Sequence, residues 1–244
     1  MPSYQTTGIV LARTNYSEAD RILRVLTPDR GKVSVLAKGA RRIKSRAGGH
    51  LELFGEVTFM LATGRNLDVV TQARLKWYPH HLTEDYRRLS LAFLMAQITD
   101  RLTAEGHATD GVYWTFLEAL HAVDTGAAGS LPELWYKLRI LGLCGFQPAL
   151  SACLVCGRHD ESAPYAFSPE KGGILCQPDA APSDAAMSPS VIKLWRLLSA
   201  HNYQSVANIT SAADLATATL PLCDEFYEHH LGKSFHVASA QNPG

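Results

Sequence analysis

Short apolar runs alternate with polar turns along the first 80 residues of the chain. The runs are rich in β-branched and aromatic residues and span residues 4–12, 21–27, 32–36, 51–61 and 67–78. Runs of this kind, separated by turn-forming residues at 28–31 and 63–66, predict five β-strands that include two hairpins. Five strands in so short a segment predict a small closed barrel. A long loop after the third strand is compatible with an OB-fold, and an SH3-like barrel is the main alternative.

From residue 82 onwards the apolar positions recur every three or four residues. The first such positions are Leu82, Tyr86, Leu89, Phe93 and Ala96. They predict a helix over residues 83–102 with Thr83 as its N-cap. Further helices are expected over residues 111–123, 131–143, 191–201 and 212–231. Ser130 and Glu133 form a capping-box pattern, residues 180–190 have the composition of a linker, and Pro221 is expected to break the last helix.

The formal net charge is zero, but the charges are unevenly distributed. Residues 1–80 hold 13 of the 23 basic residues and 6 of the 23 acidic ones, so their net charge is +7 and that of residues 81–244 is −7. A basic N-terminal part indicates nucleic acid as a partner. No apolar run reaches the length of a membrane span, and the first five residues lack a signal-peptide pattern. We therefore expect a cytoplasmic protein with no membrane partner.

The densest cationic stretch follows the third predicted strand. Five of the nine residues from Lys38 to Arg46 are cationic, so they repel one another unless an anion or solvent screens them. The predicted DNA-binding surface comprises Lys32, Lys38, Arg41, Arg42, Lys44, Arg46, Arg65, Arg74 and Lys76. The alternative is a solvated loop that only keeps the protein soluble. Candidates for base stacking are Tyr4, Tyr16, Phe54, Phe59, Trp77 and Tyr78, although an aromatic residue in a small barrel more often belongs to the core.

Three of the five cysteines have the spacing of a zinc ribbon. Cys153 and Cys156 form a C-x-x-C turn, and Cys176 with Asp179 repeats that spacing further along the chain. Four donors suit tetrahedral zinc, and Gly157, Gly172 and Gly173 permit the turns. His159 and Cys144 are alternatives to Asp179 as the fourth ligand, and a site without metal, holding ordinary buried thiols, is the alternative to zinc.

Two such pairs of ligands fill all four coordination positions of the metal, which favours a structural rather than a catalytic role. The sequence contains none of the common nucleotide-binding, zinc-protease or serine-hydrolase motifs. We therefore expect a protein with no catalytic residues, acting by binding DNA. The competing hypotheses are a metal-dependent nuclease or hydrolase and a structural adaptor that uses the acidic C-terminal part.

The chain resembles the bacterial recombination-mediator family RecO. The resemblance lies in the segments Tyr16–Asp20, Asp29–Lys32, Ala37–Ala40 with the cations that follow it, Leu51–Phe54, Cys153–Gly157 and Gly172–Cys176. The Ala-Lys-Gly-Ala segment followed by Lys44-Ser45-Arg46 is quite specific to that family, whereas the C-x-x-C turn is not. Many members carry a cysteine where this chain has Asp179.

The resemblance implies an α+β multidomain protein: an N-terminal five-stranded OB-fold barrel followed by an α-helical bundle with an inserted zinc ribbon. We expect a DNA-binding domain over residues 1–80, helical parts over 81–150 and 181–244 that form one bundle, and the ribbon over 151–180. The implied activities are binding of single- and double-stranded DNA, strand annealing without ATP, and loading of RecA together with RecR on DNA coated by single-strand-binding protein. One structural Zn²⁺ per chain and association with the nucleoid are also implied.

Overall fold

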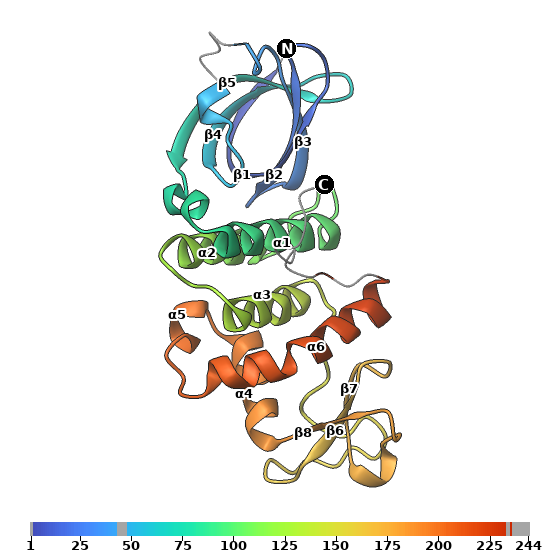
Figure 1. Ribbon diagram of the computed structural model, residues 1–244. Helices are drawn as coiled ribbons and strands as arrows, with labels where there is room; N and C mark the ends of the chain where they lie inside the picture. Colours follow the sequence, from blue (N-terminus) through green and yellow to red (C-terminus); the bar gives the residue numbers. More distant parts are fainter. Residues whose placement is uncertain (1, 43–47, 233–234, 236–244) are drawn as a thin grey trace. The chain divides into compact units, whose positions relative to one another are not determined.

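The structure, a computed structural model, describes residues 2–42, 48–232 and 235. The chain divides into two compact units, Met1–Thr125 and Gly126–Gly244. Figure 1 shows a barrel and two long helices in the first unit, and helices with a small sheet in the second. The two helices that follow the barrel group with it in the first unit. The division into four domains and the single bundle expected from the sequence stay predictions.

The barrel is the expected OB-fold. Its strands are β1 (Ser3–Asn15), β2 (Arg21–Thr27), β3 (Gly31–Ala37), β4 (Glu56–Ala62) and β5 (Asp68–Trp77). They close in the order β1-β2-β3-β5-β4, with β4 pairing back onto β1. All pairs are antiparallel except β3 with β5, where Val35 and Leu36 lie beside Asp68 and Val69. The SH3-like alternative is therefore excluded.

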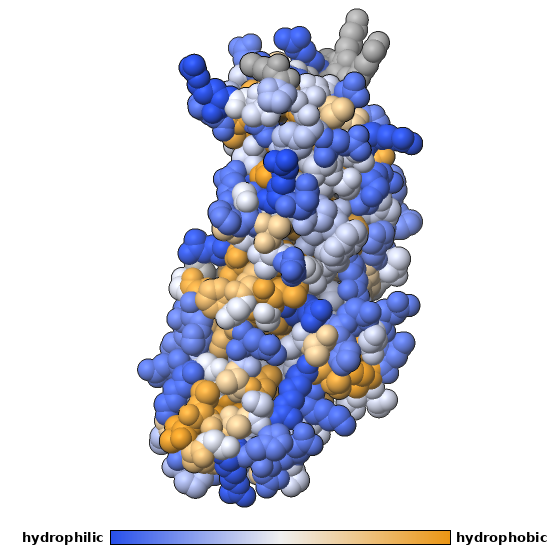
Figure 2. All heavy atoms as spheres, turned by 180° about the vertical axis from the view of Figure 1, so that it is seen from behind, coloured by the Kyte–Doolittle hydropathy of each residue, from blue (hydrophilic) through white to orange (hydrophobic). Residues whose placement is uncertain are grey.

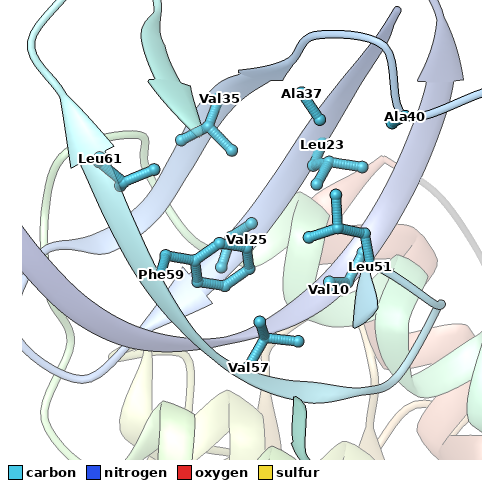
Figure 3. Close-up of a cluster of buried hydrophobic side chains, with 10 residues drawn as sticks. All are labelled: Val10, Leu23, Val25, Val35, Ala37, Ala40, Leu51, Val57, Phe59 and Leu61. Atoms are coloured by element: carbon cyan, nitrogen blue, oxygen red, sulfur yellow. The ribbon is translucent and has the colours of Figure 1, made fainter. Parts of the chain in front are cut away.

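Alternating side chains fill the barrel, as the polarity of the strands predicts (Figure 3). The buried cluster comprises Val10, Leu23, Val25, Val35, Ala37, Ala40, Leu51, Val57, Phe59 and Leu61. Gly8 permits close packing of β1 on β2, since a Cβ there would lie 2.3 Å from the Val25 side chain. Irregularities in the register of β1 with β2, between Val10 and Ala12, and of β4 with β5 bend these strands, which helps the sheet to close.

The fourth strand begins five residues later than the sequence predicts. Residues 51–55 form a turn in which Phe54 has a positive φ of 66° and donates its N–H to the carbonyl of Val10 at 2.9 Å. Leu51 and Phe54 are nevertheless buried, Leu51 inside the barrel. Their apolar character therefore reflects core packing rather than strand pairing, which is why the pattern was misleading here.

Helices α1 (Tyr86–Leu102) and α2 (Val112–Asp124) pack against the barrel. Phe54 packs edge-to-face on Phe93 of α1, with ring centroids 5.1 Å apart, and the Trp77 ring lies 3.8 Å from that of His121 of α2. The carboxylate of Glu56, nearly buried, accepts a 2.8 Å hydrogen bond from the Tyr113 hydroxyl. These contacts make the barrel and two helices one unit.

The start of α1 differs from the sequence prediction. The N-cap is Asp85, whose carboxylate accepts hydrogen bonds from the backbone N–H groups of Arg87 and Arg88, and not Thr83. Thr83 lies in the preceding 3-10 turn His80–Glu84. These backbone bonds, together with the Arg88 side chain, lower the pKa of the Asp85 carboxyl although desolvation raises it. Both residues suit a cap, so composition alone could not choose between them.

The second unit contains helices α3 (Ser130–Leu143), α4 (Pro189–Ala200), the short α5 (Tyr203–Val206) and α6 (Ala212–Leu231). Helix α3 packs on α4 and α6. The expected capping box is not formed, because Gly129 is the N-cap and no side chain caps the helix. Pro221 does not break α6, which continues for 20 residues. Pro221 and Thr217 are both exposed, so water can solvate the Thr217 carbonyl that loses its helical donor.

A three-stranded sheet lies between α3 and α4 in the sequence. Its strands are β6 (Tyr165–Ser168), β7 (Gly173–Leu175) and β8 (Ala185–Met187), in the order β7-β6-β8. Strand β8 falls in the segment expected to be a linker, so that expectation is wrong. Residues 185–187 pair with β6, where Ala185 lies beside Phe167, and their alanines gave no strand signal.

Figure 2 shows the face opposite to that of Figure 1, coloured by hydropathy. The barrel surface on this face is mainly hydrophilic with small apolar spots, whereas broader apolar patches lie over the helices and the small sheet. Among the described residues, no helix is both long and apolar enough to cross a membrane.

Candidate nucleic-acid interface and metal centre

The described part of the cationic stretch lies directly beyond β3. Lys38, Arg41 and Arg42 are exposed, and Gly39 between them has a positive φ of 66° that turns the chain away from the strand. The Arg42 N–H closes this turn onto the Gly39 carbonyl at 3.1 Å. Lys44 and Arg46 lie outside the described residues. We call residues 38–42 the basic turn.

The basic turn is fastened to the loop between β1 and β2. The Asp20 carboxylate accepts the Gly39 N–H at 2.8 Å. The Arg41 backbone N–H donates to the Ala19 carbonyl at 3.0 Å, and its guanidinium Nη1 donates to the Ser17 carbonyl at 2.8 Å. A cationic segment with these contacts is an ordered part of the barrel surface, which argues against a loop that serves solubility alone.

The other predicted cations have different surroundings. Arg65 is exposed in the turn between β4 and β5, and Arg74 is exposed on β5. Lys32 lies against α1, where its Nζ is 3.1 Å from the Asp100 carboxylate and donates to the backbone carbonyl of the same residue at 2.5 Å. Lys76 Nζ lies 2.8 Å from the Glu56 carboxylate. Lys32 and Lys76 are therefore balanced by protein carboxylates, whereas Arg65 and Arg74 are exposed.

Of the six aromatic candidates for base stacking, five are held by the protein. Phe54 and Phe59 are buried, Trp77 packs on His121, and Tyr78 packs edge-to-face on His80. Tyr4 donates its hydroxyl to Asp68 at 2.5 Å. Burial and this hydrogen bond raise the pKa of Tyr4 to about 12.

Tyr16 is the exception, since its side chain is 63% exposed in the loop between β1 and β2. That loop is the one to which the basic turn is fastened. The structure therefore brings together an exposed aromatic ring and three exposed cations that lie more than twenty residues apart in the sequence.

The four predicted metal ligands form one cluster. Ligand atoms of Cys153, Cys156, Cys176 and Asp179 all lie within 4.8 Å of one another. The C-x-x-C turn supplies two of them, and the turn after β7 that leads into the 3-10 helix Gln177–Asp179 supplies the others. Cys156 Sγ lies 3.6 Å from Cys176 Sγ, and Cys153 Sγ lies 3.3 Å from Asp179 Oδ2.

These separations fit a tetrahedral metal. Zinc–sulfur bonds of about 2.3 Å at tetrahedral angles put two sulfur ligands roughly 3.8 Å apart. The backbone N–H of Arg158 lowers the pKa of the Cys156 thiol, but its neighbours Asp179, Cys153 and Cys176 outweigh that effect and raise it to about 12. A bound cation would favour the thiolate form of Cys156, which metal binding requires. The donor set of three sulfurs and one carboxylate oxygen suits Zn²⁺.

The two alternative fourth ligands lie outside this cluster. The His159 ring nitrogen Nδ1 makes a 2.5 Å hydrogen bond with the Ser151 carbonyl. Cys144 is the C-cap residue of α3, and partial burial raises the pKa of its thiol. Asp179 is the residue that the local geometry brings to the three sulfurs, because its N–H donates to the Cys176 carbonyl at 2.9 Å and closes the turn.

A buried ionic cluster in the second unit has no counterpart in the sequence analysis. Lys137 of α3 is fully buried, and its Nζ lies 2.6 Å from Glu133, 2.5 Å from Asp224 of α6 and 2.7 Å from the Phe235 carbonyl. Burial alone would lower the pKa of Lys137, but the two carboxylates outweigh it and raise the pKa. The sequence signal was a Glu133–Lys137 pair four residues apart on a helix whose neighbouring positions are mostly apolar.

The fold and the site define a class: an OB-fold barrel with an exposed basic turn, followed by helices and a small sheet that carries a metal-ligand cluster. Comparison with known families narrows this class. The family model for the recombination protein O N-terminal domain matches residues 1–78, and the model for the recombination protein O C-terminal domain matches residues 83–238.

Relatives named DNA repair protein RecO match most of the chain. The protein from Bifidobacterium adolescentis is 36% identical over 239 residues, which cover 95% of this chain and 96% of the relative. The protein from Roseiflexus is 38% identical, covering 80% of this chain and 68% of the relative, and the protein from Desulforudis audaxviator is 39% identical, covering 81% and 82%. The chain belongs to the RecO family of DNA repair and recombination proteins.

Proposed function

We propose that the protein binds single- and double-stranded DNA through the basic turn and anneals complementary strands without ATP. The observation that carries the proposal is the position of Lys38, Arg41 and Arg42: three exposed cations on a turn held to the barrel by hydrogen bonds to the neighbouring loop. Lys44 and Arg46 continue this cationic sequence. Arg65 and Arg74 are exposed elsewhere on the barrel and extend the proposed contact surface.

The mechanism requires no bond chemistry. Two DNA strands repel each other through their phosphates, and a cluster of cations that neutralises phosphates on both lowers this repulsion while they pair. Contacts to phosphates carry no sequence information, so binding should be largely independent of sequence. The energy of annealing then comes from base pairing, and the protein lowers the electrostatic cost of bringing the strands together.

The further partners follow from family membership. We propose that the protein acts with RecR to help load RecA on single-stranded DNA coated by single-strand-binding protein. Family membership and the DNA repair names of the relatives support this proposal. Residues 81–244 carry a net charge of −7, so they repel DNA and attract basic surfaces. A basic protein partner therefore suits this acidic C-terminal part better than DNA does.

Annealing in the presence of a chelator tests the proposal against a nuclease. The purified protein is mixed with two complementary labelled oligonucleotides in EDTA without nucleotide, and in a second reaction with Mg²⁺. We expect intact duplex to form faster than without protein in both reactions, because phosphate neutralisation needs no divalent ion. Cleaved product that appears only with Mg²⁺ would instead favour a metal-dependent nuclease.

We also propose that one Zn²⁺ is held by Cys153, Cys156, Cys176 and Asp179 in a structural role. All four positions are occupied by protein ligands, which leaves no coordination site for substrate. When bound, the ion supplies a cross-link between the C-x-x-C turn and the turn after β7, and its binding energy becomes folding energy of the sheet.

Replacing Cys153 and Cys156 together with serine should abolish stoichiometric zinc and increase hydrogen exchange in β6–β8. The barrel should keep its protection, because the cluster lies wholly in the second unit. Zinc content by atomic spectroscopy and hydrogen exchange by mass spectrometry give the two readouts.

Three single variants serve as controls for the ligand set. Cys144→Ser and His159→Ala should retain zinc, whereas Asp179→Ala should weaken its retention against a chelator. One zinc per chain in the Cys153/Cys156 double variant would overturn the assignment, and loss of zinc from His159→Ala with normal retention in Asp179→Ala would move the fourth ligand to the histidine.

A further inference from the structure

We propose that Tyr16 is a base-stacking residue that makes the basic turn prefer single-stranded over double-stranded DNA. The inference rests on the proposed DNA binding by this turn and deepens it. Its starting point is the exposure of the ring, 63% in a barrel whose other aromatic candidates are buried or packed on the protein. The exposed ring lies on the loop to which the basic turn is hydrogen-bonded, and this position, rather than exposure alone, points to a role in binding.

The backbone around Tyr16 is held in a defined turn. Its N–H donates to the Asp20 carbonyl at 3.1 Å, and the Asp20 N–H donates to the Ser17 hydroxyl at 3.2 Å. The ring is therefore projected from an ordered segment, with only its two side-chain torsions free. A pre-ordered aromatic side chain loses little entropy when a base stacks on it, so more of the stacking energy appears as affinity.

The same turn holds the cations. Arg41 donates to the carbonyls of Ser17 and Ala19, the first and third residues after Tyr16, and Gly39 donates to Asp20. The guanidinium has five N–H donors and uses one of them for the Ser17 contact, so its remaining donors suit a phosphate. A nucleotide carries its phosphate and its base on one sugar. A cation and an aromatic ring on adjoining segments can therefore take both parts of one strand.

The preference for single strands follows from what each form of DNA exposes. In a duplex the bases are stacked on each other and present only their edges, so a ring outside the helix finds no base face without unstacking a step. An unpaired strand exposes base faces, and stacking on aromatic residues is insensitive to sequence. The cations should thus bind both forms, whereas the ring should add affinity for single strands alone.

The test compares full-length Tyr16→Ala, Tyr16→Phe and Tyr86→Ala on a single-stranded oligonucleotide and on a duplex of equal length, over a range of salt. Tyr86 of α1 is a matched control, since its side chain is 54% exposed but lies on a helix away from the basic turn in sequence. We expect Tyr16→Ala to weaken single-strand binding about tenfold, with duplex affinity within about twofold and an unchanged salt slope. Tyr16→Phe, which keeps the ring, and Tyr86→Ala should bind like the parent.

Two results would overturn the inference: unchanged single-strand affinity in Tyr16→Ala, or an equal loss on both forms of DNA. The charge reversal of Lys38, Arg41 and Arg42 separates this failure from that of the proposed function. If the reversal weakens binding and Tyr16→Ala does not, the basic turn remains the DNA site and Tyr16 is not part of it. If neither change affects binding, both proposals are wrong.

Discussion

Replacing Lys38, Arg41 and Arg42 with glutamate should lower the affinity for single-stranded DNA by about two orders of magnitude at 0.1 M salt. Each phosphate contact releases counterions that contribute about 0.7 to the slope of log affinity against log salt, a factor of roughly five per contact at this concentration. Loss of three contacts should flatten the slope by about 2, and annealing should slow in parallel. Fluorescence anisotropy at several salt concentrations measures both affinity and slope.

The control for this variant must carry the same charge. Arg87→Glu, Arg101→Glu and Lys193→Glu alter three other exposed cations, two on α1 and one on α4, so both triple variants have a net charge of −6 where the parent has zero. The control should lose only the affinity that follows from repulsion between its added negative charge and the DNA. We expect it to keep most of the slope of log affinity against log salt. Equal losses in the two variants would show that net charge, rather than the basic turn, governs binding.

The reversal should leave the fold intact. The three side chains are exposed, and substitutions at such positions usually change the free energy of unfolding by less than about 0.5 kcal/mol. The single interaction at risk among those described is the bond from the Arg41 guanidinium to the Ser17 carbonyl. The backbone bond from Arg41 to Ala19 does not depend on the side chain and should keep the turn in place.

Local patterns in the sequence were sufficient to predict the barrel. Alternating polarity and turn residues located four of the five strands closely, and the apolar period located α1, α2 and α3 to within a few residues. Two of the errors have a common cause. Leu51 and Phe54 are apolar because they are buried from a turn, and residues 185–187 form a strand because β6 offers a partner, so in both places tertiary contacts decided the outcome.

For the candidate sites too, the sequence revealed only those groups of residues that lie close together along the chain. The C-x-x-C turn marked the metal cluster because its ligands are close in sequence, and the cationic stretch marked the basic turn for the same reason. The position of Tyr16 beside that turn depends on hydrogen bonds between segments about twenty residues apart, from Gly39 to Asp20 and from Arg41 to Ser17. No periodicity or composition carries that information, so only the structure could distinguish Tyr16 from the five aromatic candidates that pack on the protein.

Replacing Lys137 with methionine should lower the free energy of unfolding of the second unit by about 3–5 kcal/mol. Methionine has a similar length and fills the space, but it leaves the carboxylates of Glu133 and Asp224 in the interior without this cation, and removes the donor to the Phe235 carbonyl. Urea unfolding, with hydrogen exchange of α3 and α6 to assign the transition to this unit, measures the loss. Lys193→Met on α4 removes an exposed lysine from the same unit and should have little effect.

The sign of the pH dependence provides a second test of the same cluster. Because the pKa of Lys137 is raised in the folded protein, its contribution to stability should be fully present below its ordinary pKa of 10.5 and should disappear as the pH rises through the folded value. The parent should therefore lose no stability through deprotonation of Lys137 between pH 7 and 9, which urea unfolding across this range measures. Adding Glu133→Gln and Asp224→Asn to Lys137→Met should recover much of the loss, since it removes the buried charges together. A loss that persists in the triple variant would show that the lysine acts through packing rather than through its charge.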